Sequence, residues 1–251
     1  MADLKIPWPP PPPAHPLNDN EVHVWAVSLC PPAESIASCS KLLAPDEAQR
    51  AERFRFERDQ RRFTVARGSL RAILATYVNL DPARLSFAYS SRGKPTLAEL
   101  DASNSLHFNL THSDELAVLA ITRACPLGID VEHIRPLNDA SGIADRFFSA
   151  RESQGLAALP VTEKPAAFFN LWTRKEAWLK ATGDGISESL DKVEVSFLAG
   201  ESARLISLPE AAGPIQEWSL FDLRPAEGFA GALALRCPKA RILHWNWQHP
   251  Q

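Results

Sequence analysis

Alternating apolar and polar residues predict the strands of this protein. Residues 21–27 alternate first, which suits a strand with one covered face because neighbouring side chains of a strand point to opposite sides. Alternation or a short apolar run predicts further strands at residues 106–110, 118–122, 128–131 and 193–197, and a final pair at 218–223 and 228–235.

Three longer segments have the apolar spacing of helices. Residues 46–56 and 60–78 follow Pro45, and residues 166–182 end just before Gly183, where a helix readily stops. Because helices and antiparallel strands are interspersed along the chain, the expected class is α+β, with small, mostly antiparallel sheets packed against helices.

A weak internal repeat predicts two similar halves. An Arg-Phe pair precedes each long helical region, at 53–54 and at 146–147, and residues 110–120 resemble residues 223–234. We therefore expect a pseudo-two-fold pair of α+β halves with a ligand in the crevice between them. The expected division is a proline-rich tail at 1–20, an N-terminal half at 21–124 and a C-terminal half at 125–251.

The tail has its own prediction. Seven of the ten residues from Pro7 to Pro16 are proline. Proline fixes φ and has no backbone donor, so this stretch is expected to be extended polyproline II. We favour a tail that packs along its own domain through Trp8 over a docking ligand for another protein.

Composition excludes several classes of protein. The 251 residues are 45% hydrophobic with a net charge of -3, which suits one large or two small domains and argues against nucleic-acid binding. The sequence has neither a long apolar run for a membrane helix nor the apolar core of an N-terminal secretory signal. The four cysteines lack metal-binding or redox spacing. We expect a cytoplasmic monomer without a membrane partner.

Residues 128–132, Gly-Ile-Asp-Val-Glu, place two carboxylates on one face of a predicted strand. Ile129 and Val131 would point into a core, and Asp130 and Glu132 would point the other way. Neighbouring carboxylates disfavour each other's ionised form, and a divalent cation that prefers oxygen ligands removes this conflict. The alternative is an edge strand with a solvated acidic face.

The helical segment at 172–180 carries a further acid. Trp172, Glu176 and Lys180 form a row at i, i+4 and i+8. This segment has apolar side chains on nearly every side of the helix, so Glu176 is expected to be partly buried. A partly buried acid requires a metal or another cation. An ordinary exposed Glu–Lys pair is the alternative.

Basic residues concentrate between Arg50 and Arg71, where eight arginines accompany three acidic residues. The forked donors of arginine match phosphate, and a solvated helix with Glu–Arg pairs is the alternative. Lys94 lies in a predicted turn, and Thr111 and His112 lie at a predicted strand end, where they add polar candidates.

Ser149 and Glu152 have the spacing of a capping box, in which both residues satisfy backbone groups at the start of a helix. This structural role is the simpler interpretation. A catalytic role for Glu152 is the alternative.

These segments, in this order, resemble the 4′-phosphopantetheinyl transferase superfamily, of the two-half type that activates surfactin synthetase (the Sfp type). The family signatures are G-[IV]-D-x-E and, some forty residues later, W-x-x-K-E-[AS]-x-x-K, which residues 128–132 and 172–180 match. The resemblance runs from about residue 22 to residue 235 and leaves out the proline tail. It implies an Mg²⁺-dependent enzyme, with Mn²⁺ as an alternative, that moves phosphopantetheine from coenzyme A to a serine of an acyl or peptidyl carrier protein. Such carriers serve fatty-acid, polyketide and nonribosomal-peptide synthesis.

The resemblance also implies roles for individual residues. Asp130, Glu132 and Glu176 would ligate the metal, and Lys180 would contact the pyrophosphate of coenzyme A with support from Lys175. The nucleotide and its phosphates would be held mainly by the N-terminal half, through Lys94, Thr111 and His112, with Arg50, Arg62 and Arg67 as candidates for the 3′-phosphate. In the family a second lysine often stands just before the position of Arg50, whereas this chain has Glu47 there.

The implied reaction is attack of a carrier serine on the β-phosphorus, which releases adenosine 3′,5′-bisphosphate. The serine needs a base, and Glu176 and Glu152 are both candidates. Two rival functions use the same residue types. They are a metal-dependent phosphohydrolase acting on a nucleotide pyrophosphate and a non-catalytic module that binds a carrier or a nucleotide.

Overall fold

The computed structural model describes residues 4–98, 106–183 and 190–249. Its α-helices are α1 (Ala33–Lys41), α2 (Pro45–Glu52), α3 (Glu57–Val78), α4 (Ala140–Phe147), α5 (Ala150–Ala158) and α6 (Lys164–Thr182). Its strands are β1 (Glu21–Ser28), β2 (Phe87–Tyr89), β3 (Pro95–Leu97), β4 (His107–Ser113), β5 (Leu116–Thr122), β6 (Leu127–His133), β7 (Glu194–Val195), β8 (Leu205–Ser207), β9 (Ser219–Leu223), β10 (Phe229–Leu235) and β11 (Arg241–Asn246). No helix in these ranges is long and apolar enough to cross a membrane.

The two halves have the same strand topology. In the first sheet β5 lies between β1 and β4, and in the second β10 lies between β6 and β9, with all these neighbours antiparallel. Each half also has a small two-stranded ribbon, β2–β3 in the first and β7–β8 in the second. The expected pair of similar α+β halves is therefore confirmed, and the boundary at residues 124–125 stays a prediction.

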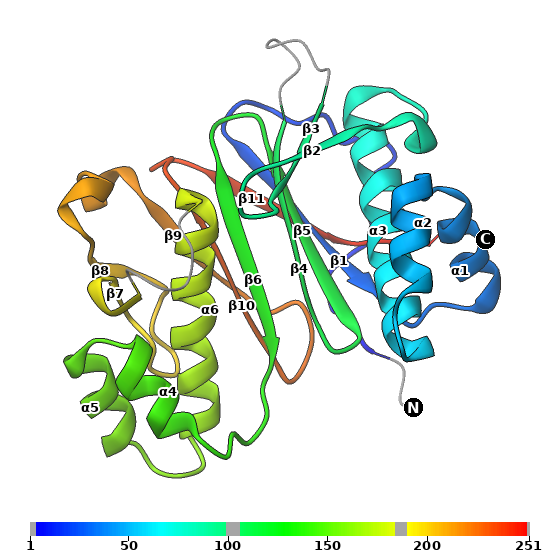
Figure 1. Ribbon diagram of the computed structural model, residues 1–251. Coiled ribbons are helices and arrows are strands. Elements are labelled where there is room, and N and C mark those ends of the chain that lie inside the picture. Colours follow the sequence, from blue (N-terminus) through cyan, green and yellow to red (C-terminus); the bar gives the residue numbers. More distant parts are fainter. Residues whose placement is uncertain (1–3, 99–105, 184–189, 250–251) are drawn as a thin grey trace.

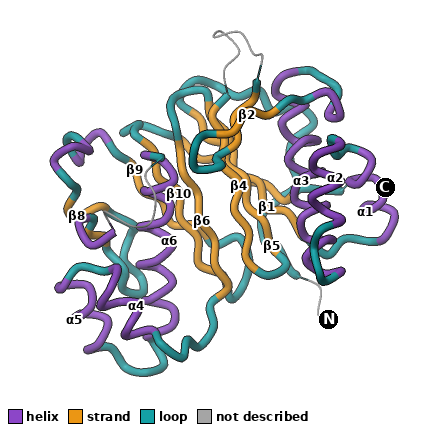
Figure 2. The backbone as a smooth tube through the Cα atoms, viewed as in Figure 1, coloured by secondary structure: helices purple, strands orange, loops and turns teal. Residues whose placement is uncertain are grey.

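The elements form four layers, with helices outside and the two sheets in the middle (Figures 1 and 2). One core packs α3 against the first sheet and another packs α6 against the second. A third core lies between the sheets and contains apolar residues of β1, β5, β6 and β10. The layers hold together because each sheet is apolar on both faces.

Several elements differ from the sequence prediction. Helices α1 and α4 and strand β11 were not expected, and the strand predicted at 193–197 is only the two residues of β7. Strand β11 comes from the end of the chain yet runs parallel to β1 in the first sheet. Its residues Arg241–Asn246 include exposed polar positions, so the pairing with β1, rather than an apolar pattern, makes it a strand.

The proline-rich tail packs on its own domain. Trp8 is only 9% exposed, and its ring centroid lies 4.8 Å from that of His244 on β11. The backbone N–H of Asn246 donates to the carbonyl oxygen of Pro9 at 2.8 Å. The expectation that the tail packs through Trp8 is thus confirmed, and the tail covers the outer edge of β11.

Gly128 allows α6 to lie directly on β6. A Cβ atom at this position would stand 2.1 Å from the carbonyl oxygen of Ala177 and 2.4 Å from the backbone nitrogen of Ala181. Both atoms belong to the helix backbone, which cannot turn aside as a side chain does. The glycine of the G-I-D-V-E segment is therefore needed for close packing.

This packing predicts that Gly128→Ala destabilises the protein by about 2–3 kcal/mol, because the helix must move away from the strand. Urea unfolding of the variant and the wild type measures the difference. Gly155→Ala is the control and should cost less, since its added Cβ would stand 2.9 Å from the tip of the Phe197 ring, a side chain that can move aside, and not from backbone. Equal stability of Gly128→Ala and wild type would contradict the packing argument.

Candidate functional site

Two carboxylates of β6 face α6. Ile129 and Val131 are buried in the core between the sheets, and the alternate residues Asp130 and Glu132 take the opposite face, as the alternation predicts. Glu176 comes from α6, which packs over this face. Asp130 is 5% exposed and Glu176 is 7% exposed, so two of the three acids are buried.

The three acids influence one another electrostatically. Burial raises the pKa of Glu176 from 4.5 to about 7, with further increases from the negative charges of Asp130 and Glu132. Burial also raises the pKa of Asp130, against the opposing effect of Lys180. These carboxylates need a cation to remain ionised together.

Lys180 supplies one positive charge. Its Nζ lies 2.6 Å from Asp130 Oδ1 and also donates to the backbone oxygen of Ile129 at 3.3 Å. It also reaches Thr111 Oγ1 at 3.4 Å, while Thr111 donates to the same oxygen of Asp130 at 3.1 Å. Residues of β4, β6 and α6 thus meet at one point.

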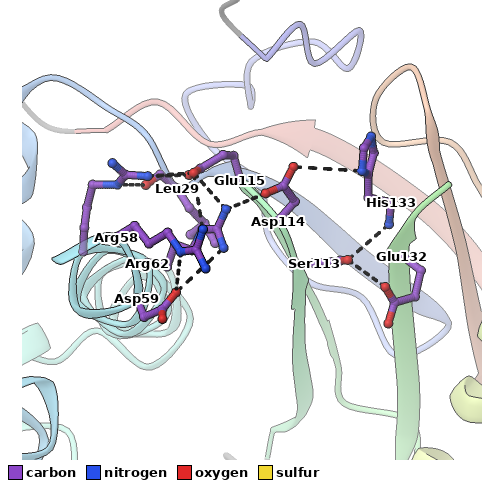
Figure 3. Close-up of polar contacts among 10 residues, drawn as sticks. Leu29, Arg58, Asp59, Arg62, Ser113, Asp114, Glu115, Glu132 and His133 are labelled. Atoms are coloured by element: carbon purple, nitrogen blue, oxygen red, sulfur yellow. Dashed lines mark hydrogen bonds and ion pairs between the residues drawn. The ribbon is translucent and has the colours of Figure 1, made fainter. Parts of the chain in front are cut away.

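Strand β4 lies beside β6 and contacts it through alternate side chains. Asn109 Oδ1 accepts from the backbone N–H of Ile129 at 2.9 Å, Thr111 reaches Asp130, and Ser113 Oγ donates to Glu132 Oε2 at 2.7 Å. Figure 3 shows Ser113 between Glu132 and the backbone N–H of His133. Ser113 was not among the predicted site residues, although its period-two spacing with Thr111 placed both side chains on one face of the strand.

The donor set suits a hard divalent cation. Asp130 Oδ2 and Glu176 Oε1 are buried and have no hydrogen-bond partner, so each has an oxygen free for a metal. Within the described ranges, however, no group of three or more His, Cys, Asp or Glu side chains is arranged so that it could hold a metal ion. The carboxylates would have to turn toward one another, with Asp130 leaving its pair with Lys180.

Lys94 joins the two halves beside this site. Its Nζ donates to the carbonyl oxygens of Leu127, at 2.8 Å, and Lys180, at 2.6 Å. Burial and then the charge of Lys180 lower its pKa. The turn between β2 and β3 is thereby attached to the C-terminal end of α6, on which Lys180 stands.

The remaining residues predicted to bind the nucleotide come from α2, α3 and β4 of the N-terminal half. His112 is exposed as a whole residue, but surrounding atoms remove part of the water around its ring. This partial desolvation, and then the charges of Arg62 and Lys180, lower the pKa of His112. Arg62 pairs with Asp114 at 2.5 Å and with Glu115 at 3.0 Å, as Figure 3 shows. Arg67 pairs with Glu47, whereas Arg50 is exposed and its guanidinium lies over the ring of Phe63, 5.3 Å from the centroid.

Comparison with known proteins identifies the family of this chain. Residues 126–234 match the family described as the 4′-phosphopantetheinyl transferase superfamily, and residues 29–124 match the 4′-phosphopantetheinyl transferase, N-terminal family. The 4′-phosphopantetheinyl transferase HetI of Nostoc sp. is 41% identical over 232 residues, which cover 92% of this chain and 94% of that protein. The chain belongs to the 4′-phosphopantetheinyl transferase superfamily.

Two Bacillus relatives support the same assignment. The 4′-phosphopantetheinyl transferase psf-1 of Bacillus pumilus is 39% identical over 68% of this chain and 71% of its own length. The 4′-phosphopantetheinyl transferase Sfp of Bacillus subtilis is 30% identical over 68% of this chain and 74% of its own length. The expected two-half type of transferase is therefore confirmed.

Two predicted site residues of this phosphopantetheinyl transferase lie apart from the three acids. Lys175 and Glu152 are almost fully buried and form an ion pair at 2.5 Å. Lys175 Nζ also donates to the backbone oxygens of Leu190 and Val193, at 2.7 and 2.6 Å. This pair joins α6 to α5 and to the segment before β7, inside the C-terminal half.

The remaining contacts of Glu152 are structural. Its Oε2 accepts from the backbone N–H of Ser149 at 2.9 Å, which completes the capping box expected from the sequence. Its Oε1 accepts from the backbone N–H of Val195 at 2.9 Å. Both carboxylate oxygens are therefore engaged, and the structure does not bring Glu152 or Lys175 to Lys180 and the three acids.

The raised pKa of Glu176 predicts how the stability of the metal-free transferase depends on pH. Between pH 4.5 and about 7 the native state holds a proton at Glu176 that the unfolded state has released. Stability therefore falls as pH rises through this window, by about 1–3 kcal/mol in total, and the loss is complete above the folded pKa. Urea unfolding in EDTA at pH 5 and pH 8 measures it.

Glu176→Gln provides the comparison, because glutamine does not titrate. At pH 8 the free energy of unfolding of the variant should equal or exceed that of the wild type. At pH 5 this difference should be smaller, because only the wild type gains stability from protonation of Glu176. An identical pH dependence of the two proteins would contradict the burial of an ionisable Glu176.

Proposed function

We propose that this transferase moves the 4′-phosphopantetheine group of coenzyme A to a serine of an acyl or peptidyl carrier protein and releases adenosine 3′,5′-bisphosphate. One observation carries the proposal: the buried acids Asp130 and Glu176 and the partly exposed Lys180 lie together at the junction of the two halves. Such a junction, with acids for a metal and a lysine for phosphate, suits phosphoryl transfer.

Asp130, Glu132 and Glu176 would hold Mg²⁺. The unpartnered buried oxygens of Asp130 and Glu176 support this assignment, as does their mutual repulsion without a cation. When bound, the metal would offset the negative charge that builds on the phosphoanhydride oxygens. Ser113 would orient Glu132 through its 2.7 Å hydrogen bond.

Lys180 is proposed to bind the pyrophosphate once Asp130 turns to the metal. Its amine stands at the site and is anchored by backbone and hydroxyl oxygens rather than by a second carboxylate. A positive charge held in a partly buried position stabilises the departing adenosine bisphosphate more than a fully solvated one would.

The proton of the carrier serine is proposed to pass to Glu176 as the serine oxygen bonds to the β-phosphorus and the bond to the leaving phosphate breaks. Glu176 Oε1 is buried and has no hydrogen-bond partner, so this oxygen is available to accept the proton. Glu152 is a poorer candidate because both of its oxygens are already occupied by backbone groups and Lys175.

Nucleotide contacts are proposed along the N-terminal half. His112 would offer an exposed ring and Arg50 an exposed guanidinium to the nucleotide. Lys94 would act mainly by holding the C-terminal end of α6. Arg62 is engaged by two acids, so it is the least available of the three arginine candidates for the 3′-phosphate.

Incubation with coenzyme A, Mg²⁺ and a panel of apo carrier proteins tests the proposed function. We expect a carrier mass gain of one phosphopantetheine and release of adenosine 3′,5′-bisphosphate. Release of phosphopantetheine to water without carrier modification would instead identify a phosphohydrolase. Binding without turnover on any carrier would identify a non-catalytic module.

A further inference from the structure

A cavity of about 380 Å³ lies between α2, α3, the β2–β3 ribbon and β4. Its wall combines two arginines with aromatic and apolar side chains, namely Arg50, Arg67, Phe63, Tyr89 and Leu110. Two acids, Asp46 and Glu47, also line it. Cations beside ring faces suit a ligand that has both a phosphate and a flat base. The composition of this wall therefore fits a nucleotide.

Arg67 is held in a fixed position in this wall. It is only 8% exposed, its Nε donates to Glu47 and its Nη2 donates to the hydroxyl oxygen of Tyr89. Its guanidinium also lies over the ring of Phe87, 4.3 Å from the centroid. A guanidinium has five N–H donors, and these two bonds use two, so three remain without a partner among the described residues.

Glu47 is the residue that orients Arg67. It is 3% exposed, its Oε1 accepts from Arg67, and its Oε2 accepts from Arg71 at 2.6 Å and from the backbone N–H of Ala44 at 2.9 Å. Arg71 itself is anchored by the carbonyl oxygens of Pro82 and Leu85. Arg67 and Arg71 share the one carboxylate of Glu47, so these three side chains have a net positive charge. Arg50 formally balances Asp46 in the same wall, so the positive charge beside the cavity remains.

We propose that Glu47 is a positioning residue that aims Arg67 into this cavity to bind a phosphate monoester, the 3′-phosphate of coenzyme A. The proposal rests on the proposed function for the identity of the nucleotide. An acidic residue would thus help to bind an anion. Glu47 would hold the guanidinium of Arg67 in one orientation and leave its remaining N–H donors available to the phosphate. The simpler alternative is that Glu47, Arg67 and Arg71 only hold α2 against α3.

Two possible roles of Glu47, as a negative charge and as a residue that orients Arg67, predict opposite effects of its removal on anion binding. If Glu47 acted only through its charge, its removal would strengthen the binding of an anion nearby. If it orients Arg67, its removal weakens binding, because a free arginine must lose rotamer entropy to reach the phosphate. Neutralisation of Glu47 therefore separates the two roles by the sign of the effect.

The experiment compares adenosine 3′,5′-bisphosphate with adenosine 5′-monophosphate by titration calorimetry on the full chain. The ratio of the two dissociation constants reports recognition of the 3′-phosphate alone, and a partly unfolded variant affects both ligands equally. We expect about a tenfold or greater preference for the bisphosphate in the wild type, which Arg67→Met reduces to near unity.

Three further variants complete the design. Glu47→Gln should lower the preference at least severalfold, and Glu47→Asp, which keeps the charge but shortens the side chain, should lower it too. Glu52→Gln, an exposed acid of the same helix, should leave it unchanged. An unchanged or increased preference in Glu47→Gln, or an unchanged one in Glu47→Asp or Arg67→Met, would overturn the proposal.

Failure of the proposed function would be recognised separately. Transfer from coenzyme A and from dephospho-coenzyme A to an apo carrier should show Glu47→Gln raising KM for coenzyme A while KM for the dephospho form and kcat stay close to wild type. If the wild type modified no carrier, the proposed function would fail, whereas the binding ratios would still decide the role of Glu47.

Discussion

Replacement of Glu176 by glutamine should reduce phosphopantetheine transfer by about three orders of magnitude while the protein remains folded. Glutamine has nearly the same shape but cannot ionise, so it can neither complete a set of three carboxylates around a cation nor accept the proton of the serine. Glu176 Oε1 has no hydrogen-bond partner, so the substitution breaks no hydrogen bond of that atom. Single-turnover transfer to an apo carrier, together with thermal unfolding, measures both effects.

The matched control is Glu163→Gln, an exposed glutamate immediately before the first residue of the same helix. It should transfer at the wild-type rate. Mg²⁺ should raise the unfolding temperature of the wild type and of Glu163→Gln but hardly that of Glu176→Gln. Wild-type turnover by Glu176→Gln would refute the assignment of Glu176 to the metal and to the serine proton.

Lys175→Met should destabilise the protein by about 3–5 kcal/mol, because the substitution leaves Glu152 as a buried and unpaired charge. Glu152→Gln should destabilise the protein by a similar amount, because it leaves the amine of Lys175 buried without its opposite charge. The pair is 0% and 2% exposed in its side chains, so water cannot replace the missing partner. Urea unfolding of both single variants measures the loss.

The double variant, Lys175→Met with Glu152→Gln, tests the interpretation. Removal of both charges should recover much of the stability lost in either single variant. At a temperature where all variants are folded, we expect their transfer rates to remain within about tenfold of wild type, since neither residue contacts the proposed site. A stable Glu152→Gln variant without activity would instead favour Glu152 as the base.

Local patterns predicted much of the fold. The alternation in residues 21–27 corresponds to β1, and the long apolar helix at 166–182 corresponds to α6, Lys164–Thr182. The repeat of residues 110–120 at 223–234 corresponds to β4 and β5 in one half and to β9 and β10 in the other. These features depend on neighbours within one element, which is why a sequence pattern reveals them.

Partners distant in the chain could not be predicted in the same way. The basic stretch offered two interpretations, phosphate recognition or Glu–Arg pairs. In the structure Arg62 reaches Glu115 and Arg67 reaches Glu47, contacts between separate elements. Strand β11 similarly depends on β1, more than 200 positions earlier, to which it hydrogen-bonds. No local spacing encodes such pairings.

The sequence by itself determined that Asp130 and Glu132 share one face of a strand and that Glu176 and Lys180 share one row of a helix, because these relations follow from the repeats of the two backbones. The tertiary structure alone decided which neighbours join them. Successive helical residues point about 100° apart, so Glu176 faces β6 while Lys175 enters the core of the C-terminal half beside Glu152. The close approach of α6 to β6 over Gly128 is what places the helix row opposite the strand acids.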